Sequence, residues 1–140
     1  MARRRVSTVQ IRAVGAVVLD GAGQLLLIRR ARPPAAGTWS LPGGRVEAGE
    51  TDQDALTREV AEETGLRVAV GALVGTVERT AGPGATYVIR DYACTVIGGS
   101  LAPADDAAEA RWCKPAEVRA LATSPQLVET LEKWGVLPPA

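Results

Sequence analysis

The sequence contains no histidine and no phenylalanine, and it has only two cysteines, Cys94 and Cys113. Without histidine, catalytic triads with an imidazole base and zinc sites with imidazole ligands are excluded. Two cysteines are too few for a disulfide scaffold, so we expect buried free thiols. Any side chain that stacks on a ring must come from three tryptophans, two tyrosines or an arginine.

Net charge is also absent, because 16 basic residues balance 16 acidic ones. A balanced chain has no overall field that would attract nucleic acid or an anionic membrane. No apolar run approaches the ~20 residues that span a bilayer. We therefore expect a cytoplasmic protein, a monomer or homodimer, with neither nucleic acid nor membrane as a partner.

The length of 140 residues and the hydrophobic content of 46% indicate a single globular domain, residues 1–140. Residues 1–8 are expected to form a flexible tail. Strands are predicted at 13–19 and 24–30, joined as a hairpin across Asp20–Gly23. Further strands are predicted at 66–78, 85–97 and 109–114.

Helices are predicted from about Asp52 to Thr64, from Pro115, and from Ser124 as N-cap with Pro125 in the first turn. Strand pairs with one central helix and C-terminal helices indicate an α+β fold of mixed layers.

What the sequence does have is an unusual concentration of acid between Gly44 and Leu66. Glu59, Glu62 and Glu63 fall within one stretch of a predicted helix. Glu59 and Glu63 lie one above the other, about 5–6 Å apart at Cβ, where like charges repel unless a cation lies between them. Ligands that are all oxygen suit a hard ion, Mg²⁺ or Mn²⁺. The alternative is a solvated acidic helix face.

The spacing of these residues favours the first interpretation. The chain matches G-x5-E-x7-R-E-U-x-E-E-x-G-U, where U is aliphatic, at every specified position. The matching residues are Gly44, Glu50, Arg58, Glu59, Val60, Glu62, Glu63, Gly65 and Leu66. This pattern resembles the Nudix box, the signature of the Nudix hydrolase family. The resemblance implies an α/β/α sandwich around a mixed β-sheet.

The resemblance also implies roles for individual residues. Glu59, Glu62 and Glu63 are expected to bind metal, with the carbonyl of Gly43 as a further ligand. Arg58 is expected to pair with Glu50 and tie the helix to the preceding loop; alternatively, Glu50 contacts the metal through water.

The general base is expected to be a glutamate, with Glu62 as the first choice. A loop acid outside the motif is the alternative, and Asp105, Asp106 and Glu109 are the candidates. Each of the three can instead be an ordinary surface acid.

Four residues are predicted to contact substrate. Arg30 and Arg45 could neutralise phosphate oxygens, and Trp39 and Tyr87 could stack on a base. Because neighbouring strand residues point to opposite faces, Arg29 and Arg30 cannot both face the substrate. For Trp39 and Tyr87, a role in the core is the alternative.

The expected function is Mg²⁺- or Mn²⁺-dependent cleavage of the diphosphate in a nucleoside diphosphate linked to another group. Substrates like (d)NTP are favoured over ADP-ribose or nucleotide sugars. Pro83 and Tyr87 are the candidates for positions that mark other substrate classes in the family, but neither offset fits well. A module that senses nucleotides without turnover is the alternative of another class.

Overall fold

The computed structural model describes residues 9–32, 35–102 and 107–138. The predicted tail, residues 1–8, lies outside this part, as do Asp105 and Asp106. The strands of the described part are β1 (Val9–Val18), β2 (Leu25–Arg30), β3 (Trp39–Ser40), β4 (Gly43–Arg45), β5 (Leu66–Thr80), β6 (Ala85–Gly99) and β7 (Ala107–Cys113). Its helices are α1 (Asp52–Thr64), α2 (Pro115–Ala120) and α3 (Leu127–Lys133).

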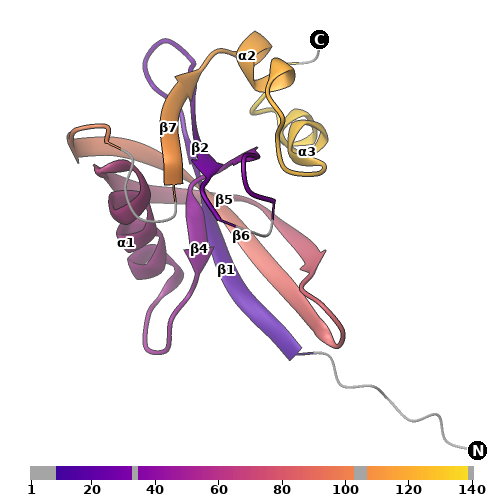
Figure 1. The fold of residues 1–140 in the computed structure, drawn as a ribbon. Helices are drawn as coiled ribbons and strands as arrows, with labels where there is room; N and C mark the ends of the chain where they lie inside the picture. The colour runs from indigo at the N-terminus through magenta and orange to yellow at the C-terminus, as the bar shows by residue number, and fades with distance from the viewer. Residues whose placement is uncertain (1–8, 33–34, 103–106, 139–140) are drawn as a thin grey trace, which may run out of the picture.

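The strands form two sheets (Figure 1). The larger sheet has the order β4-β1-β6-β5, in which β1 and β6 are parallel and the other pairs are antiparallel. The smaller sheet has the order β3-β2-β7 and is antiparallel. Helix α1 lies on one side of the larger sheet and α3 on the other (Figure 1). The predicted mixed sheet between helices is confirmed.

Two of the predicted elements are wrong. The strands β1 and β2 do not form a hairpin ladder; apart from the bridge between Leu19 and Leu25, they belong to different sheets. The turn itself is present, since Asp20 Oδ1 accepts hydrogen bonds from the N–H groups of Ala22 and Gln24. One edge of β1 pairs with β6 along its whole length, and the other pairs with β4 at residues 13–15, while β2 pairs with β3 and β7.

The last helix begins at Leu127 and not after Ser124. Ser124 donates its N–H to the carbonyl of Trp39, at 2.8 Å, which holds this segment against β3. Gln126 then turns the chain with a φ of 67°. Tertiary hydrogen bonding has therefore overridden the local capping signal.

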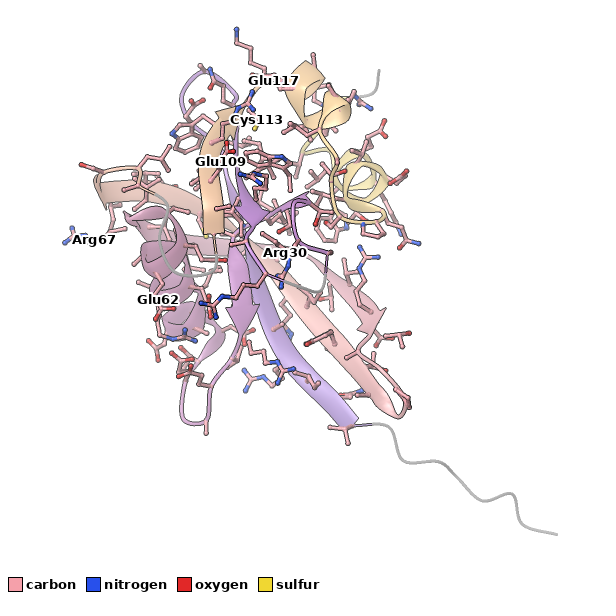
Figure 2. All side chains as sticks on the ribbon, viewed as in Figure 1. Arg30, Glu62, Arg67, Glu109, Cys113 and Glu117 are labelled. Atoms are coloured by element: carbon pink, nitrogen blue, oxygen red, sulfur yellow. The ribbon has the colours of Figure 1, made fainter. Side chains whose placement is uncertain are left out.

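Two apolar clusters flank the larger sheet because neighbouring strand residues face opposite ways. On the α3 side, Val17, Leu27 and Trp39 pack with Cys113 and Leu131. Figure 2 shows Cys113 between β7 and the C-terminal helices. Cys94 and Cys113 are both buried and free, as predicted.

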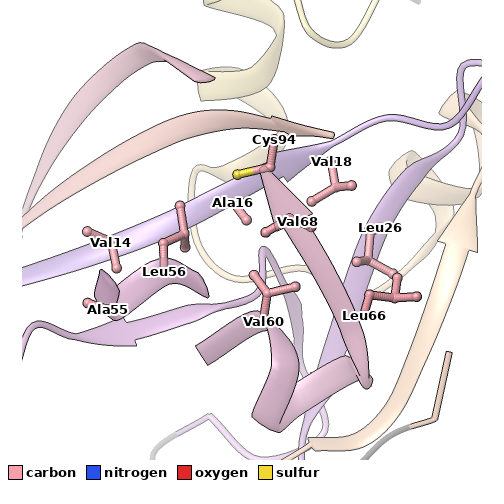
Figure 3. Close-up of a cluster of buried hydrophobic side chains, with 10 residues drawn as sticks. All are labelled: Val14, Ala16, Val18, Leu26, Ala55, Leu56, Val60, Leu66, Val68 and Cys94. Atoms are coloured by element: carbon pink, nitrogen blue, oxygen red, sulfur yellow. The ribbon is translucent and has the colours of Figure 1, made fainter. Parts of the chain in front are cut away.

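On the α1 side, Val14, Ala16 and Val18 of β1 pack against Leu56 and Val60 of the helix (Figure 3). The helix begins with a capping box in which Thr51 Oγ1 accepts from Asp54 N at 3.1 Å. It ends at Gly65, whose φ of 75° suits the left-handed cap. These signals fix α1 and its acidic residues against the sheet.

No helix within residues 9–32, 35–102 and 107–138 is long and apolar enough to cross a bilayer.

Candidate active site

The side of the larger sheet that faces away from α1 borders an open cleft of about 860 Å³. The cleft extends from the end of β4, past α1, to the start of α3. Its acidic and basic lining residues are Glu47, Glu59, Glu62, Glu63, Asp91, Arg30, Arg45, Arg58 and Arg79. All three glutamates predicted to bind metal therefore border the same space.

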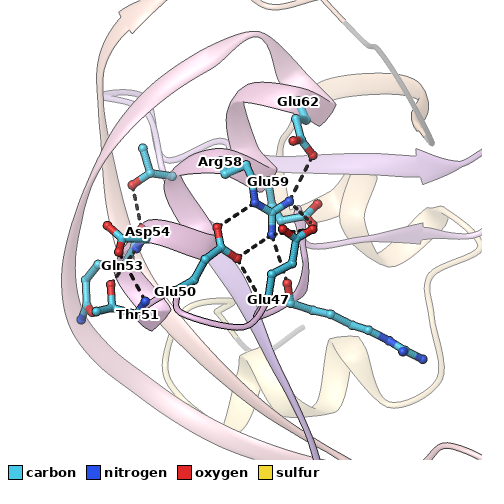
Figure 4. A network of polar contacts seen from close by, with 10 residues as sticks. Glu47, Glu50, Thr51, Gln53, Asp54, Arg58, Glu59 and Glu62 are labelled. Atoms are coloured by element: carbon cyan, nitrogen blue, oxygen red, sulfur yellow. Dashed lines mark hydrogen bonds and ion pairs between the residues drawn. The ribbon is translucent and has the colours of Figure 1, made fainter.

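Arg58 organises the acidic part of the cleft (Figure 4). Its guanidinium binds both carboxylate oxygens of Glu50, at 2.8 and 2.9 Å, and donates to the carbonyl of Arg45. The predicted pair between helix and loop is present. The bidentate bond to Arg58 lowers the pKa of Glu50 to about 2 and raises the pKa of Arg58. Glu50 is thus held as an anion that orients the arginine.

Nη1 of Arg58 contacts two of the predicted metal ligands. It lies 2.9 Å from Glu59 Oε1 and 3.3 Å from Glu62 Oε2. Burial raises the pKa of Glu59, and the bond from Arg58 opposes that rise. Glu62 is less enclosed, with 44% of its side chain exposed.

Glycines allow the two enclosed glutamates to lie against the backbone. A Cβ at Gly44 would lie 2.6 Å from the carboxylate carbon of Glu59. Glu63, which is 7% exposed, accepts a hydrogen bond from the N–H of Gly43 at 2.8 Å. A Cβ at Gly43 would lie 2.0 Å from the carbonyl oxygen of Val14. Gly43 therefore fits only as a residue without a side chain, whereas a side chain at Gly44 would displace the carboxylate of Glu59.

The donor chemistry of this corner suits a hard divalent cation, because Glu59, Glu62 and Glu63 offer only oxygen atoms. In the described part of the chain, however, no three acidic or cysteine side chains converge on one point. The guanidinium of Arg58 neutralises Glu59 and Glu62 in this arrangement.

Three of the four predicted substrate residues line the cleft: Arg30, Arg45 and Tyr87. Arg45 donates to the hydroxyl of Tyr87 at 2.9 Å, and its guanidinium lies 5.5 Å from the ring centre. The interpretation of Trp39 as a stacking residue is wrong. Its side chain is 6% exposed, packs in the core beside α3 and does not line the cleft.

The expected alternation of Arg29 and Arg30 is confirmed. Arg30 lines the cleft, whereas Arg29 binds Glu109 through two nitrogens at 2.8 and 3.1 Å. Glu109 does not line the cleft, and Figure 2 shows it on β7, apart from Glu62 on α1. This separation argues against Glu109 as the loop base.

Three residues that were not predicted also line the cleft: Asp91, Arg79 and Gly15. Asp91 is 6% exposed, and burial raises its pKa to about 7 while Arg79 opposes the rise. An acid within an otherwise uncharged strand face, on the alternate positions shared with Tyr87 and Ile89, was the available signal. A glycine, Gly15, within the apolar run of β1 was the second signal in the sequence.

Comparison with known proteins identifies the family. The family model described as the NUDIX domain matches residues 9–134. An "ADP-ribose pyrophosphatase" of Methanocaldococcus jannaschii is 41% identical over 102 residues, which are 69% of this chain and 60% of that protein. A "putative 8-oxo-dGTP diphosphatase 2" of Mycobacterium tuberculosis is 44% identical over 64% of this chain and 63% of its own length. The chain thus spans less than two thirds of these relatives.

Solved structures of other proteins share the fold of this chain. The E. coli ORF135 protein superposes with a TM-score of 0.72 at 32% identity, over 95% of this chain and 96% of that one. A MutT protein from Methanosarcina mazei superposes with a TM-score of 0.80 at 23% identity, over 91% of this chain and 94% of that one. The second match supports the fold alone.

Proposed function

Because the chain belongs to the NUDIX domain family, we propose that it is a hydrolase of phosphoric anhydride bonds that cleaves the diphosphate of a nucleotide. The observation that carries the proposal is the joint position of Glu59, Glu62 and Glu63 beside one cleft that arginines also line. Acids alone would repel a diphosphate. A cleft that presents both acids and arginines suits a substrate that is bound with a cation.

The residues that would hold the cation are Glu59, Glu62, Glu63 and the backbone of Gly43. When bound, Mg²⁺ or Mn²⁺ supplies charge neutralisation for the diphosphate and acidifies a water molecule. Arg58 would orient the carboxylates of Glu59 and Glu62, to which its Nη1 donates.

Glu62 is the proposed general base. Its side chain is the most exposed of the three and is bonded only to Arg58, at 3.3 Å, among the contacts in the described residues. A carboxylate held this loosely can accept the proton of an attacking water molecule. Arg30 and Arg45, on other walls of the cleft, are placed to neutralise phosphate oxygens.

The proposed substrates are nucleoside triphosphates or their deoxy forms. The relative named as an 8-oxo-dGTP diphosphatase supports this class, and the relative named as an ADP-ribose pyrophosphatase supports the second candidate, ADP-ribose. Cytoplasmic location and a monomeric or dimeric state remain predictions.

Product release from dGTP, 8-oxo-dGTP, dATP and ADP-ribose, with Mg²⁺ and with Mn²⁺, tests the proposal. We expect turnover of at least one nucleotide, and loss of about 10²- to 10⁴-fold in kcat for Glu62→Gln. Glu78→Gln is the matched control, because Glu78 is exposed on β5 and does not line the cleft.

Two results would contradict the proposal. Nucleotide binding without turnover by the wild type would favour a sensing module. Equal turnover by Glu62→Gln and the wild type would remove Glu62 as the base and return the choice to the acids outside the motif.

A further inference from the structure

Asp91 is a buried acid that the proposed hydrolysis does not use. It lies in the middle of β6, is 6% exposed and borders the cleft. Within residues 9–32, 35–102 and 107–138, its carboxyl group makes no hydrogen bond or ion pair, and Arg79 is the cation that attracts it. No side-chain oxygen in this part of the chain is both fully enclosed and unbonded, so the carboxyl group is open to the cleft that it lines. A largely buried carboxyl group that bonds no other residue and is open to a cleft is a candidate for contact with a ligand.

The alternation of β6 places Asp91 at the inner end of a row. Tyr87, Ile89 and Asp91 line the cleft, whereas Arg90 and Tyr92 face the α1 side and bond to Asp52. Tyr87 is partly exposed and holds Arg45, while Asp91 is the buried member of the row. The row therefore extends from Tyr87, which binds Arg45, to the buried carboxyl group of Asp91.

A strip of backbone that lines the cleft joins Asp91 to the acidic corner. Gly15 pairs with Gly43 on one side and with Asp91 on the other. Neighbouring strands are about 4.8 Å apart, so Gly43 and Asp91 are separated by about 10 Å. A Cβ at Gly15 would lie 2.1 Å from Asp91 Oδ1, so any side chain there would close the strip. The distance suits a nucleoside whose diphosphate lies near Glu63.

We propose that Asp91 selects the base of the substrate, by accepting hydrogen bonds from the adjacent ring N–H and amino group of a guanine-type purine. The inference rests on the proposed function, because it assumes that the cleft takes a nucleotide. Asp91 is a specificity residue and takes no part in bond cleavage.

The surroundings of Asp91 favour a base over a sugar. The apolar side chains of Val77, Ile89 and Leu127 also line the cleft, and flat apolar surfaces suit an aromatic ring. An ionised carboxylate only accepts hydrogen bonds, through two oxygens, and guanine presents two neighbouring donors on one edge. Adenine and cytosine present a donor beside an acceptor there, and thymine presents one donor between acceptors.

The same pairing accounts for a buried acid in this position. Burial raises the pKa of Asp91 to about 7, so without a ligand the carboxyl group is partly protonated near pH 7. Two N–H donors favour the charged form and bring the group back to the carboxylate. A base that lacks one donor leaves one oxygen of the buried acid without a partner, and it is therefore disfavoured.

The test compares dGMP with dIMP, which differs only by the missing amino group, in calorimetric binding to the full chain. We expect the wild type to bind dGMP about 10- to 100-fold more tightly. Asp91→Asn should reduce the ratio below about threefold, because its amide N–H group opposes one donor. Asp91→Ser, which has a smaller side chain, serves as a second variant, and Glu78→Gln is the control that keeps the ratio.

Hydrolysis of dGTP and dITP is measured on the same variants to separate this inference from the hydrolase proposal. Turnover with an unchanged dGTP-to-dITP ratio in both Asp91 variants overturns base selection and leaves the hydrolase in place. A dGMP preference that Asp91 variants lose, without turnover in the wild type, supports base selection and rejects the hydrolase. Failure of dGMP, dIMP, dGTP and dITP to bind overturns base selection, and the hydrolase proposal then depends on turnover of dATP or ADP-ribose.

Discussion

Two buried aspartates, Asp52 and Asp91, lie on opposite sides of strand β6, and their environments differ. Asp52, at the start of α1, accepts from Arg12 at 2.7 Å, Arg90 at 3.3 Å and Tyr92 at 2.6 Å. Asp91 lies between Arg90 and Tyr92 in sequence but faces the cleft, where no bond reaches it from the described residues.

The two pKa shifts express this difference. Burial raises the pKa of Asp52, but bonds from Tyr92, Arg12 and Arg90 outweigh that effect and lower it. For Asp91, burial dominates and the pKa rises to about 7. On the α1 side, Asp52 is fully hydrogen-bonded and holds the helix in place. On the cleft side, Asp91 is left available to a ligand.

The largest expected effect is on the cleft side, in the pH dependence of Asp91→Asn. The pKa of Asp91 is 3.8 in its ordinary state and about 7 in the folded protein, so the folded state binds the proton more tightly. The wild type therefore loses stability as pH rises from about 4 to 7, and Asn does not. Between pH 5 and pH 8, the free energy of unfolding of the wild type should fall by about 2–3 kcal/mol relative to the variant.

Denaturant unfolding of both proteins at pH 5 and pH 8, without nucleotide, measures this difference. Parallel curves at the two pH values would show that Asp91 has a satisfied carboxylate. In that case the contrast with Asp52 would disappear.

A second prediction concerns the backbone at Gly15, beside Asp91. Gly15→Ala places a methyl group where Asp91 Oδ1 lies, so we expect a loss of about 2 kcal/mol in unfolding free energy and weaker dGMP binding. Gly21→Ala is the control, because a Cβ there meets nothing within 4 Å. Equal stability of both variants would mean that the cleft floor tolerates side chains.

The smallest effect is expected on the α1 side. Tyr92→Phe removes one of the three side chains that donate to Asp52, while Arg12 and Arg90 remain. The expected loss is about 1 kcal/mol in unfolding free energy, with the dGMP affinity unchanged. A loss of nucleotide binding comparable to that of Gly15→Ala would show that the two faces are coupled.

The elements that the sequence predicted well are those determined locally. Thr51 and Gly65 mark the two ends of α1 through hydrogen bonds within a few residues, and the motif spacing brings Glu59, Glu62 and Glu63 to one cleft. Asp91 and Gly15 were not predicted as cleft residues, because their position beside each other depends on the parallel pairing of β1 with β6. No local signal specifies that pairing.

The errors have the same origin. The turn at Asp20 was correct, but the partners of β1 are distant strands, so the expected hairpin did not form. Trp39 has an aromatic ring near the motif, yet packing against Leu127 and Leu131 places it in the core. Sequence spacing identified the chemical groups, and long-range packing decided which of them reach the cleft.

The guanidinium of Arg58, bonded to Glu50, Glu59 and Glu62, gives this corner its own counter-charge. The acidic helix can therefore fold before any ion arrives, with mutual repulsion already relieved. Folding of this corner is therefore expected to need no divalent cation, so that cation binding would be a separate event.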